Sequence, residues 1–338
     1  MDPNHKINSN MFYSKRKMGN RNILFCCIVV LMATFEVVAQ KEPQYTQYMY
    51  NIGSFNPAYV GTVEKTEIAG LYRAQWIDIE GAPRTMRFGM NIPLANEKNG
   101  IGFNVINDQL GPSTQTFVDL AYSFQVQFSN DTKLSFGLDA GGSFLNVDFS
   151  KGNFENPNEP LLDQSTINKF YPTIGAGAFL YADNWYTGLS VPNFLTNGIY
   201  DEEVATVVDD KLQFNLIGGY IFDLSEGLKF KPAFLVNYLK GAPVNINVST
   251  NFLISDVFTL GASYRVDNAV SGLAGFQISS SAFLGYSYDY NTNSLGEYNS
   301  GSHEVILKFY LGSGDGSKRD RNKNAKGKSK QIDTPRFF

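Results

Sequence analysis

The sequence predicts an all-β protein, a 14-stranded antiparallel transmembrane β-barrel. First, apolar and polar side chains alternate with a period of two along most of the 338 residues, and successive side chains of a strand point to opposite faces. Second, the alternating segments are about ten residues long or more, whereas soluble strands usually have about five or six. Third, the number of segments is even, and their connections alternate between short and long as in bacterial outer-membrane barrels.

Residues 1–39 have the three parts of a secretory signal peptide. A basic stretch at residues 15–21 precedes an apolar stretch at residues 23–33, and a small-residue cleavage site follows at residues 37–39. A single transmembrane anchor is the alternative, but the apolar stretch is too short and Glu36 interrupts its end. We therefore expect cleavage after Ala39 and localisation of the mature chain in the outer membrane.

The composition of the chain excludes several classes of protein. Both cysteines, Cys26 and Cys27, lie in the signal peptide, so no disulfide can form in the mature chain. The two histidines, His5 and His303, are too few for a multi-histidine metal site. Residues 40–312 contain 15 basic and 27 acidic side chains, and this net charge of −12 argues against nucleic acid as a partner.

Residues 66–312 are expected to form the barrel, after a periplasmic or plug-like segment at residues 40–65. The expected strands are 66–76, 84–94, 100–108, 115–128, 132–149, 170–182, 184–191, 211–223, 227–239, 243–254, 257–267, 270–279, 281–290 and 304–312. Tight turns follow the even-numbered strands, and the longest connections, residues 150–169, 192–210 and 291–303, follow odd-numbered ones. A soluble two-sheet sandwich would share the alternation, but not this rhythm of short periplasmic turns and long extracellular loops.

Each expected strand has an apolar face toward lipid and a polar face toward the lumen. Leu260 and Val248 lie on the apolar faces, so arginine at either position is expected to impair assembly. Ser263 and Asn247 lie on the polar faces, where arginine is expected to be tolerated.

Two further groups of side chains near strand ends have structural interpretations. Four aromatic residues are expected in the girdles that meet the membrane interface: Tyr72, Trp76, Trp185 and Tyr186. Four arginines are expected to line the lumen or to seal it through ion pairs with acids: Arg73, Arg84, Arg87 and Arg265.

No catalytic, cofactor-binding or metal-binding residues are predicted. His303 precedes the last strand without the serine and acid that a hydrolase would need. The loop acids Glu202, Glu203, Asp209 and Asp210 could attract calcium, but they lack the spacing of a calcium-binding loop. The glycine pairs lack the strand-to-helix pattern of a phosphate-binding loop. We therefore expect no enzymatic activity and no cofactor.

The tail at residues 313–338 contains eight basic and three acidic residues among Gly, Asn and Ser, without apolar periodicity. This composition is typical of a disordered segment. An even number of strands is expected to place the tail in the periplasm, beside the N-terminal end of the barrel. There it is either a docking arm for periplasmic partners, through its charge and its terminal Phe residues, or a passive extension.

Several blocks of the mature chain together resemble one family. The first two read Gln-Tyr-Thr-Gln-Tyr-Met-Tyr and Asn-Pro-Ala-Tyr-Val-Gly, and in chain order the blocks occupy residues 44–50, 56–61, 72–76, 81–85, 189–193, 285–290 and 301–307. In sequence and order they closely resemble the PorP/SprF family, which are type IX secretion system membrane proteins of the Bacteroidetes.

The resemblance implies an outer-membrane barrel without enzymatic activity that acts in type IX secretion or gliding motility. It implies a role in the export or surface attachment of a specific large adhesin-like protein. That protein, outer-membrane lipid and periplasmic components of the machinery would be its partners. The resemblance does not imply any set of binding residues. The chain differs from the family pattern at its C-terminal end, where a basic tail follows the last strand. The alternative is an outer-membrane transporter or porin for small solutes, since a barrel of this size can enclose a channel.

Overall fold

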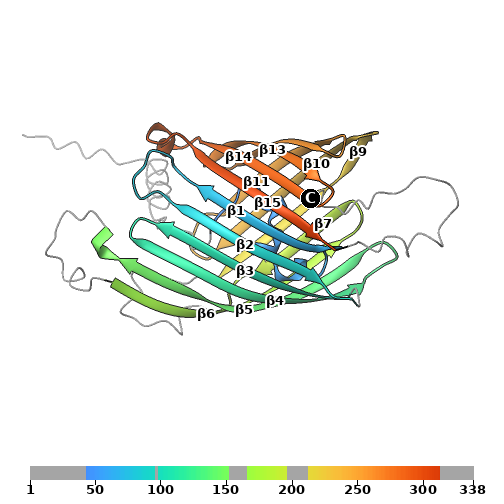
Figure 1. Ribbon diagram of the computed structural model, residues 1–338, viewed down its shortest axis with the longest axis horizontal. Helices are drawn as coiled ribbons and strands as arrows, with labels where there is room; N and C mark the ends of the chain where they lie inside the picture. Colours follow the sequence, from blue (N-terminus) through green and yellow to red (C-terminus); the bar gives the residue numbers. More distant parts are fainter. Residues whose placement is uncertain (1–42, 96–97, 152–165, 196–211, 313–338) are drawn as a thin grey trace, which may run out of the picture. The chain divides into compact units, whose positions relative to one another are not determined.

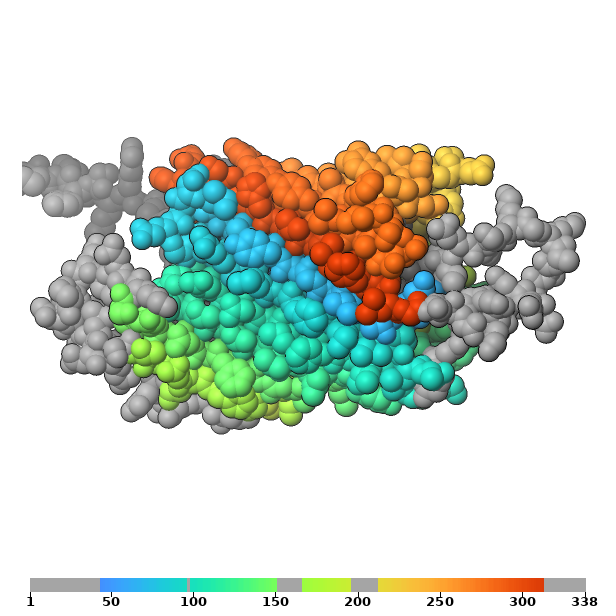
Figure 2. All heavy atoms as spheres, viewed as in Figure 1, coloured from blue at the N-terminus to red at the C-terminus, as the bar shows by residue number. Residues whose placement is uncertain are grey.

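The computed structural model describes residues 43–95, 98–151, 166–195 and 212–312. In these ranges the strands form one antiparallel sheet. The sheet closes into a barrel because β1 (Thr66–Ala74) pairs with β15 (Ser302–Leu311). Figure 1 shows these two strands side by side, and in Figure 2 their atoms, blue and orange-red, lie against each other.

The strands between β1 and β15 follow the predicted segments. In chain order they are β2 (Arg84–Pro93), β3 (Asn99–Leu110), β4 (Ser113–Gln127), β5 (Lys133–Asp148), β6 (Thr166–Tyr181), β7 (Trp185–Val191), β8 (Gln213–Tyr220), β9 (Phe222–Ser225), β10 (Leu228–Leu239), β11 (Asn245–Ile254), β12 (Phe258–Arg265), β13 (Ala269–Ser279) and β14 (Ala282–Asn291). β6 begins at Thr166, before the predicted residue 170, because residues 166–169 also pair with β5; Asp148 lies opposite Thr166. β1 ends before the predicted residue 76 because Trp76 has a φ of 48°, outside the extended region.

β8 and β9 are two halves of one barrel strand. Both pair with β10, and the interruption at Ile221 lies opposite the stretch of β10 that contains Pro232. Proline has no N–H to donate, so the ladder of hydrogen bonds is weakened at this point. Counting the two halves as one, the barrel has 14 strands, which confirms the predicted fold class.

The two rims of the barrel differ in the length of their connections. At one rim, here called the short-turn rim, the connections are residues 94–98, 128–132, 182–184, 226–227, 255–257 and 280–281. At the opposite rim, here called the long-connection rim, they include residues 75–83, 149–165, 192–212 and 292–301. The two ends of the barrel, Thr66 and Leu311, lie opposite each other at the short-turn rim. This is the predicted arrangement, although residues 111–112 and 266–268 make tight turns at the long-connection rim as well.

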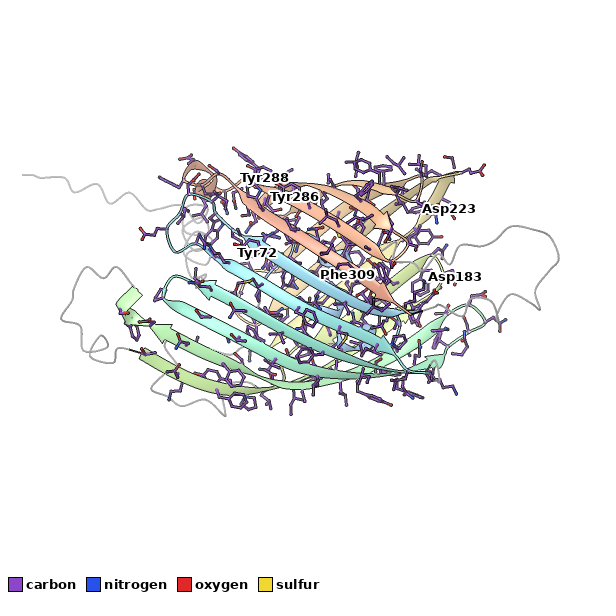
Figure 3. All side chains as sticks on the ribbon, viewed as in Figure 1. Tyr72, Asp183, Asp223, Tyr286, Tyr288 and Phe309 are labelled. Carbon is purple, nitrogen blue, oxygen red and sulfur yellow. The ribbon has the colours of Figure 1, made fainter. Side chains whose placement is uncertain are left out.

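Apolar side chains cover the outside of the barrel, and polar side chains point into the lumen together with the apolar ones that pack on the chain's own N-terminal residues. Leu260 and Val248 are 44% and 43% exposed, whereas Asn247 and Ser263 are only 2% and 6% exposed. Figure 3 shows the outer position of aromatic side chains such as those labelled on β1, β14 and β15. The predicted assignment of the two faces is therefore correct.

The lumen contains the chain's own residues 43–65, here called the luminal segment. The segment forms three short 3-10 helices, η1 (Tyr48–Tyr50), η2 (Ile52–Ser54) and η3 (Pro57–Tyr59). It begins beside β11 near the long-connection rim, where Asn245 Nδ2 donates to Gln44 Oε1 over 3.2 Å. It leads into β1 at the short-turn rim, so it passes through the barrel from one rim to the other.

The main hydrophobic core lies where the luminal segment meets the barrel wall. Apolar residues of the segment pack together with inward-pointing residues of the strands: Tyr48, Met49 and Ile52 with Phe179, Phe283 and Ile306. Two other short 3-10 helices, η4 (Phe149–Lys151) and η6 (Ser294–Glu297), lie in connections. Among the helices of the described ranges, none has the length and apolar character needed to cross a membrane.

Candidate functional site

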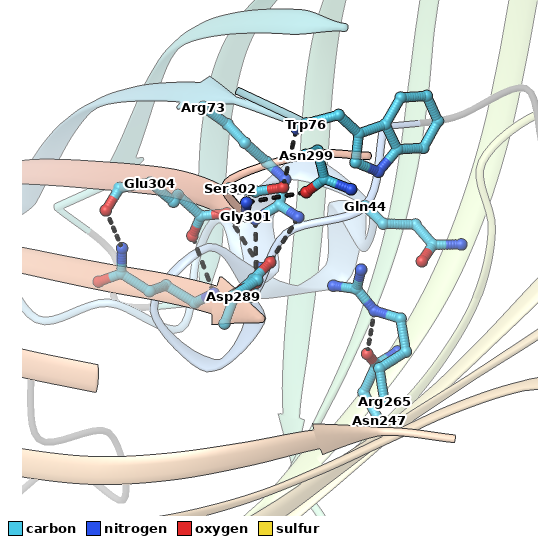
Figure 4. Close-up of polar contacts among 12 residues, drawn as sticks. Gln44, Arg73, Trp76, Asn247, Arg265, Asp289, Asn299, Gly301, Ser302 and Glu304 are labelled. Atoms are coloured by element: carbon cyan, nitrogen blue, oxygen red, sulfur yellow. Dashed lines mark hydrogen bonds and ion pairs between the residues drawn. The ribbon is translucent and has the colours of Figure 1, made fainter. Parts of the chain in front are cut away.

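Three charged side chains from adjacent strands form a buried cluster in the lumen. Arg73 of β1, Glu304 of β15 and Asp289 of β14 all point inward and are almost fully buried. Arg73 Nη2 lies 2.7 Å from Asp289 Oδ2, and Arg73 Nη1 lies 3.0 Å from Glu304 Oε2 (Figure 4). The register of the sheet places Arg73 directly opposite Glu304. Each buried charge therefore has an opposite charge, which such groups require inside a protein.

The cluster, Arg73, Asp289 and Glu304, holds the start of the luminal segment. The backbone N–H groups of Thr46 and Gln47 donate to the two carboxylate oxygens of Glu304 over 3.0 and 2.9 Å. The Thr46 hydroxyl donates to Asp289 and accepts a hydrogen bond of 2.9 Å from Arg73 Nη1. Hydrogen bonds to charged groups are stronger than neutral ones. We therefore identify the cluster as the anchor of the luminal segment at this end of the lumen.

A second ion pair lies deeper in the lumen, toward the short-turn rim. Lys308 Nζ of β15 lies 2.8 Å from Glu67 Oε2 of β1, and both side chains are buried. Asn91 Nδ2 of β2 donates to the other oxygen of Glu67 over 2.9 Å. Sequence analysis missed this pair, although both charges lie on the polar faces of the first and last strands, which closure of the barrel brings together.

The second half of the luminal segment is held by neutral hydrogen bonds to the wall. Asn56 caps η3 by accepting from the N–H of Ala58 over 3.0 Å. Ser135 Oγ donates to the carbonyl oxygen of Ala58 over 2.7 Å. The N–H of Gly61 donates to Ser123 Oγ over 2.9 Å. These contacts fix the block at residues 56–61 against β4 and β5.

Glycines of the wall make room for the same block. A Cβ atom at Gly137 would lie 2.2 Å from the backbone nitrogen of Ala58, and one at Gly100 would lie 2.1 Å from the Cα of Gly61. No side chain fits at these distances, so the backbones approach each other directly. The glycines are therefore required by the luminal segment.

Four blocks of the family resemblance thus meet in the lumen. The block at residues 44–50 binds to the cluster built from residues 72–76, 285–290 and 301–307. Sequence reasoning identified these blocks but had no signal that they contact each other, because the hydrogen-bonded residues are as far as 258 positions apart.

The predicted arginines have different positions. Arg87 and Arg265 are buried in the lumen with Arg73, and each donates from Nε over 2.7 Å, to Asn104 and to Asn247. Arg84 is exposed, so its predicted position in the lumen is wrong. The reason is the alternation along β2, which places Arg84 on the same face as the exposed Met86.

The predicted aromatic girdle is correct in part. Tyr72 points outward and is 44% exposed, and Trp185 is half-buried. Tyr186 follows Trp185 in β7 and therefore points into the lumen, where it stacks on Phe179 with ring centroids 5.6 Å apart. The prediction for Tyr186 is wrong because it considered the position along the strand and ignored the face.

His303 lies on the outer face of β15, inside the strand and not in a loop before it. Its Nδ1 is 2.7 Å from the hydroxyl of Tyr286, and its ring packs beside Tyr288. The loop acids at residues 202–203 and 209–210 lie outside the described residues. Within the described ranges, no group of three or more His, Cys, Asp or Glu residues is arranged to hold a metal ion.

A cavity of about 90 Å³ lies at the long-connection rim, between the luminal segment and the wall. We call it the rim cavity. Gln44, Tyr45 and Tyr48 line it on one side, and residues of β3 to β6, β8, β10 and β11, with Pro192 and Asn193 after β7, line it on the other. The hydroxyl of Tyr48 donates to the carbonyl oxygen of Ala233 over 3.0 Å. The wall contributes carboxylates and side-chain amides, which can bind a polar or cationic group.

Comparison with known proteins identifies one family. The model of the family described as type IX secretion system membrane protein PorP/SprF matches residues 37–309. No curated protein matches the chain in sequence.

Among solved structures, the CymD monoaromatic hydrocarbon channel is similar with 11% sequence identity and a TM-score of 0.48, over 82% of this chain and 96% of that chain. The outer membrane protein Omp33 of Acinetobacter baumannii is similar with 9% identity and a TM-score of 0.40, over 73% of this chain and 98% of that chain.

Proposed function

Because the chain belongs to the PorP/SprF family of type IX secretion system membrane proteins, we propose that it supports the export or surface attachment of one specific large adhesin-like protein. In this proposal the barrel is a non-enzymatic anchor in the outer membrane, and its signal peptide is removed after Ala39. The partners are the exported protein and periplasmic components of the secretion or gliding machinery.

The observation that carries this proposal is the filled lumen. Met49, Ile52 and Val60 of the luminal segment are each 1% exposed. Removing three such side chains from the core would cost about 5–9 kcal/mol, and breaking the buried contacts of Glu304 would add about 3–5 kcal/mol. These costs are comparable with the whole stability of a typical domain, about 5–15 kcal/mol. The luminal segment is therefore part of the folded structure, which favours a docking role over passage through the barrel.

The alternative function, a transporter or porin for small solutes, is less well supported. The rim cavity of about 90 Å³ has room for only about six to nine water molecules. Its floor is formed by the luminal segment, which continues to the short-turn rim. The segment thus occupies space in the lumen that a passing solute would need.

Deletion of the gene tests the proposed function. We expect one large surface protein to be lost from the cell surface, while permeability of the outer membrane to small hydrophilic solutes stays unchanged. Surface proteomics and solute uptake measure the two effects, and a strain complemented with the wild-type gene is the control. An unchanged surface proteome together with the loss of uptake of one solute would replace the proposal with the transporter function.

A further inference from the structure

We propose that the rim cavity binds a single Lys or Arg side chain of the polypeptide that docks on the long-connection rim. This inference rests on the proposed function, since it takes the exported surface protein as the partner. It assigns a binding site to a cavity that the anchoring of the luminal segment does not use.

Two carboxylates in the rim cavity have no cation of their own. Asp119 accepts a hydrogen bond of 2.9 Å from Thr173 Oγ1. The carboxyl group of Asp139 lies beside the backbone N–H of Gly175, while its buried oxygen Oδ1 has no partner in hydrogen-bond geometry. In the part of the chain that the structure describes, neither forms an ion pair, whereas Glu67 and Glu304 each pair with a basic residue. Neighbouring carboxylates of like charge are stabilised by a cation between or beside them.

The backbone around the carboxylates is shaped to hold them. A Cβ atom at Gly141 would lie 2.5 Å from Asp119 Oδ1, and one at Gly175 would lie 2.2 Å from Asp139 Oδ1. Each carboxylate therefore occupies space that a larger residue on the neighbouring strand would fill. The glycines thus leave room for both carboxylates, and the hydrogen bond from Thr173 orients Asp119 before any ligand arrives. Preorganised groups bind with less loss of entropy.

A buried amide in the same cavity lacks an acceptor. Asn215 is 1% exposed, and its Oδ1 accepts hydrogen bonds of 2.9 and 2.7 Å from Gln213 and Asn237. Its Nδ2 has no partner, although Asn215 lines the cavity. Buried polar groups are normally paired, so an unpaired donor is an independent sign that a ligand completes the site. A peptide that inserts a basic side chain also brings carbonyl oxygens, which could accept from this amide.

The size of the cavity limits the ligand to one side chain. A volume of about 90 Å³ corresponds to about six to nine water molecules, which is comparable with one extended Lys or Arg side chain. A helix or a strand of a partner would not fit. A bare metal ion is also disfavoured, because the described residues provide no group of three or more His, Cys, Asp or Glu ligands.

The connections that join the strands of the cavity have the charge that attracts a basic partner. Residues 149–165 and 192–212 contain eight acidic and two basic residues in sequence. Such an excess of negative charge raises the rate at which a cationic partner meets this rim. These connections are not part of the proposed site, but they favour the same sign of charge in the ligand.

Peptide binding to the purified full-length mature protein in detergent tests the proposal. The probe is a fluorescein-labelled pentapeptide with one Arg between glycines. The control peptide has citrulline in place of Arg, because citrulline is neutral and has nearly the same shape. Fluorescence anisotropy is expected to show binding of the Arg peptide and at least tenfold weaker binding of the citrulline peptide. Asp139→Asn and Asp119→Asn are each expected to weaken binding of the Arg peptide at least tenfold.

Asp183→Asn is the matched control, because Asp183 is exposed in a turn at the short-turn rim (Figure 3) and should leave binding unchanged. Heat-modifiable migration on gels verifies that each variant is folded. Equal binding of the two peptides, or undiminished binding by both cavity variants, would overturn the proposal.

A rival occupant is the chain's own Lys41, which precedes the cavity-lining Pro43 by two residues. If the Arg peptide binds only after Lys41→Gln, the site belongs to the chain's own N-terminal residues and the proposal for a partner is wrong. The proposed function can be refuted independently of this inference. Peptide binding without any change in the surface proteome of the deletion strain would refute that function alone, and the converse result would refute this inference alone.

Discussion

At the scale of single residues, the inward-pointing charges decide how the lumen is organised. Glu304 contacts Arg73 through an ion pair and accepts from two consecutive N–H groups of the luminal segment. One side chain thus connects the last strand, the first strand and the luminal segment. Closure of the barrel and placement of the luminal segment are therefore coupled at this residue.

Glu304→Gln tests this coupling. The substitution removes the charge that faces Arg73 and one acceptor for the backbone of Thr46 and Gln47. We expect a loss of about 3 kcal/mol, at the lower end of the range for a broken buried ion pair, because Arg73 keeps its contact with Asp289. The temperature at which gel migration changes from folded to unfolded measures the effect. Glu297→Gln in the exposed η6 is the control, and an equal shift in both variants would contradict the prediction.

Arginine substitutions test the two faces of the barrel wall. On the lumen face, the structure changes the result that the sequence alone predicts. Leu260→Arg places a charge against lipid, at a cost of about 2–4 kcal/mol near the bilayer midplane. Asn247→Arg was expected to be tolerated, yet Asn247 is buried and accepts a hydrogen bond from Arg265. Two arginines would then share one buried site, so we revise the expectation and predict poor assembly there too. The yield of folded barrel in outer-membrane fractions measures both, and normal assembly of Asn247→Arg would show an open lumen at this position.

At the scale of elements, the luminal segment and the wall have complementary surfaces. The block at residues 56–61 lies where glycines of β3 and β5 leave space, and hydroxyls of β4 and β5 hold its backbone. The wall strands have long apolar outer faces, but their inner faces are matched to one occupant. This match explains why glycines occur within strands whose alternation otherwise favours larger side chains.

Gly137→Ala tests the match between segment and wall. The added methyl group would lie 2.2 Å from the backbone nitrogen of Ala58, so one of the two backbones must move. Overpacking of this kind costs about 1–3 kcal/mol, and we expect less folded barrel and faster proteolysis of the luminal segment. Gly272→Ala is the control, because a Cβ atom there meets nothing within 4 Å. Equal behaviour of the two variants would show that the segment is not held against β5.

At the scale of the whole molecule, the barrel is closed without the tail. β15 ends at Leu311, and its partner residue Thr66 begins β1, so the last ladder is complete before residue 313. The tail would leave from the short-turn rim, which is the periplasmic side in outer-membrane barrels. Its basic charge suits an acidic periplasmic surface.

Truncation after Gly312 tests the role of the tail. We expect the barrel to assemble with unchanged heat-modifiable migration, because every strand pair is retained. Crosslinking to periplasmic components then distinguishes a docking arm, whose crosslinks disappear, from a passive extension, whose crosslinks stay. Loss of the barrel itself would show that the terminal Phe residues serve assembly.

The sequence by itself determined the fold class, the approximate positions of the strands and the alternation of their two faces. These features are local, because the period of two and the turn residues act over a few positions along the chain. The inward positions of Arg73, Arg87 and Arg265 were predicted from their polar strands, but the partners that they contact were not. Errors such as Arg84 and Tyr186 occurred where position along a strand was considered without the alternation of its faces.

Only the tertiary structure decided what the polar faces bind. The contact of Glu304 with Thr46 spans 258 positions, and the pair of Lys308 and Glu67 forms only because the first and last strands meet. Alternation shows that a side chain points inward, but it carries no information about which inward side chains oppose each other across a closed barrel. That depends on the register and closure of the whole sheet, and so does the rim cavity, where strands distant in sequence bring Asp119, Asp139 and Asn215 to one lining.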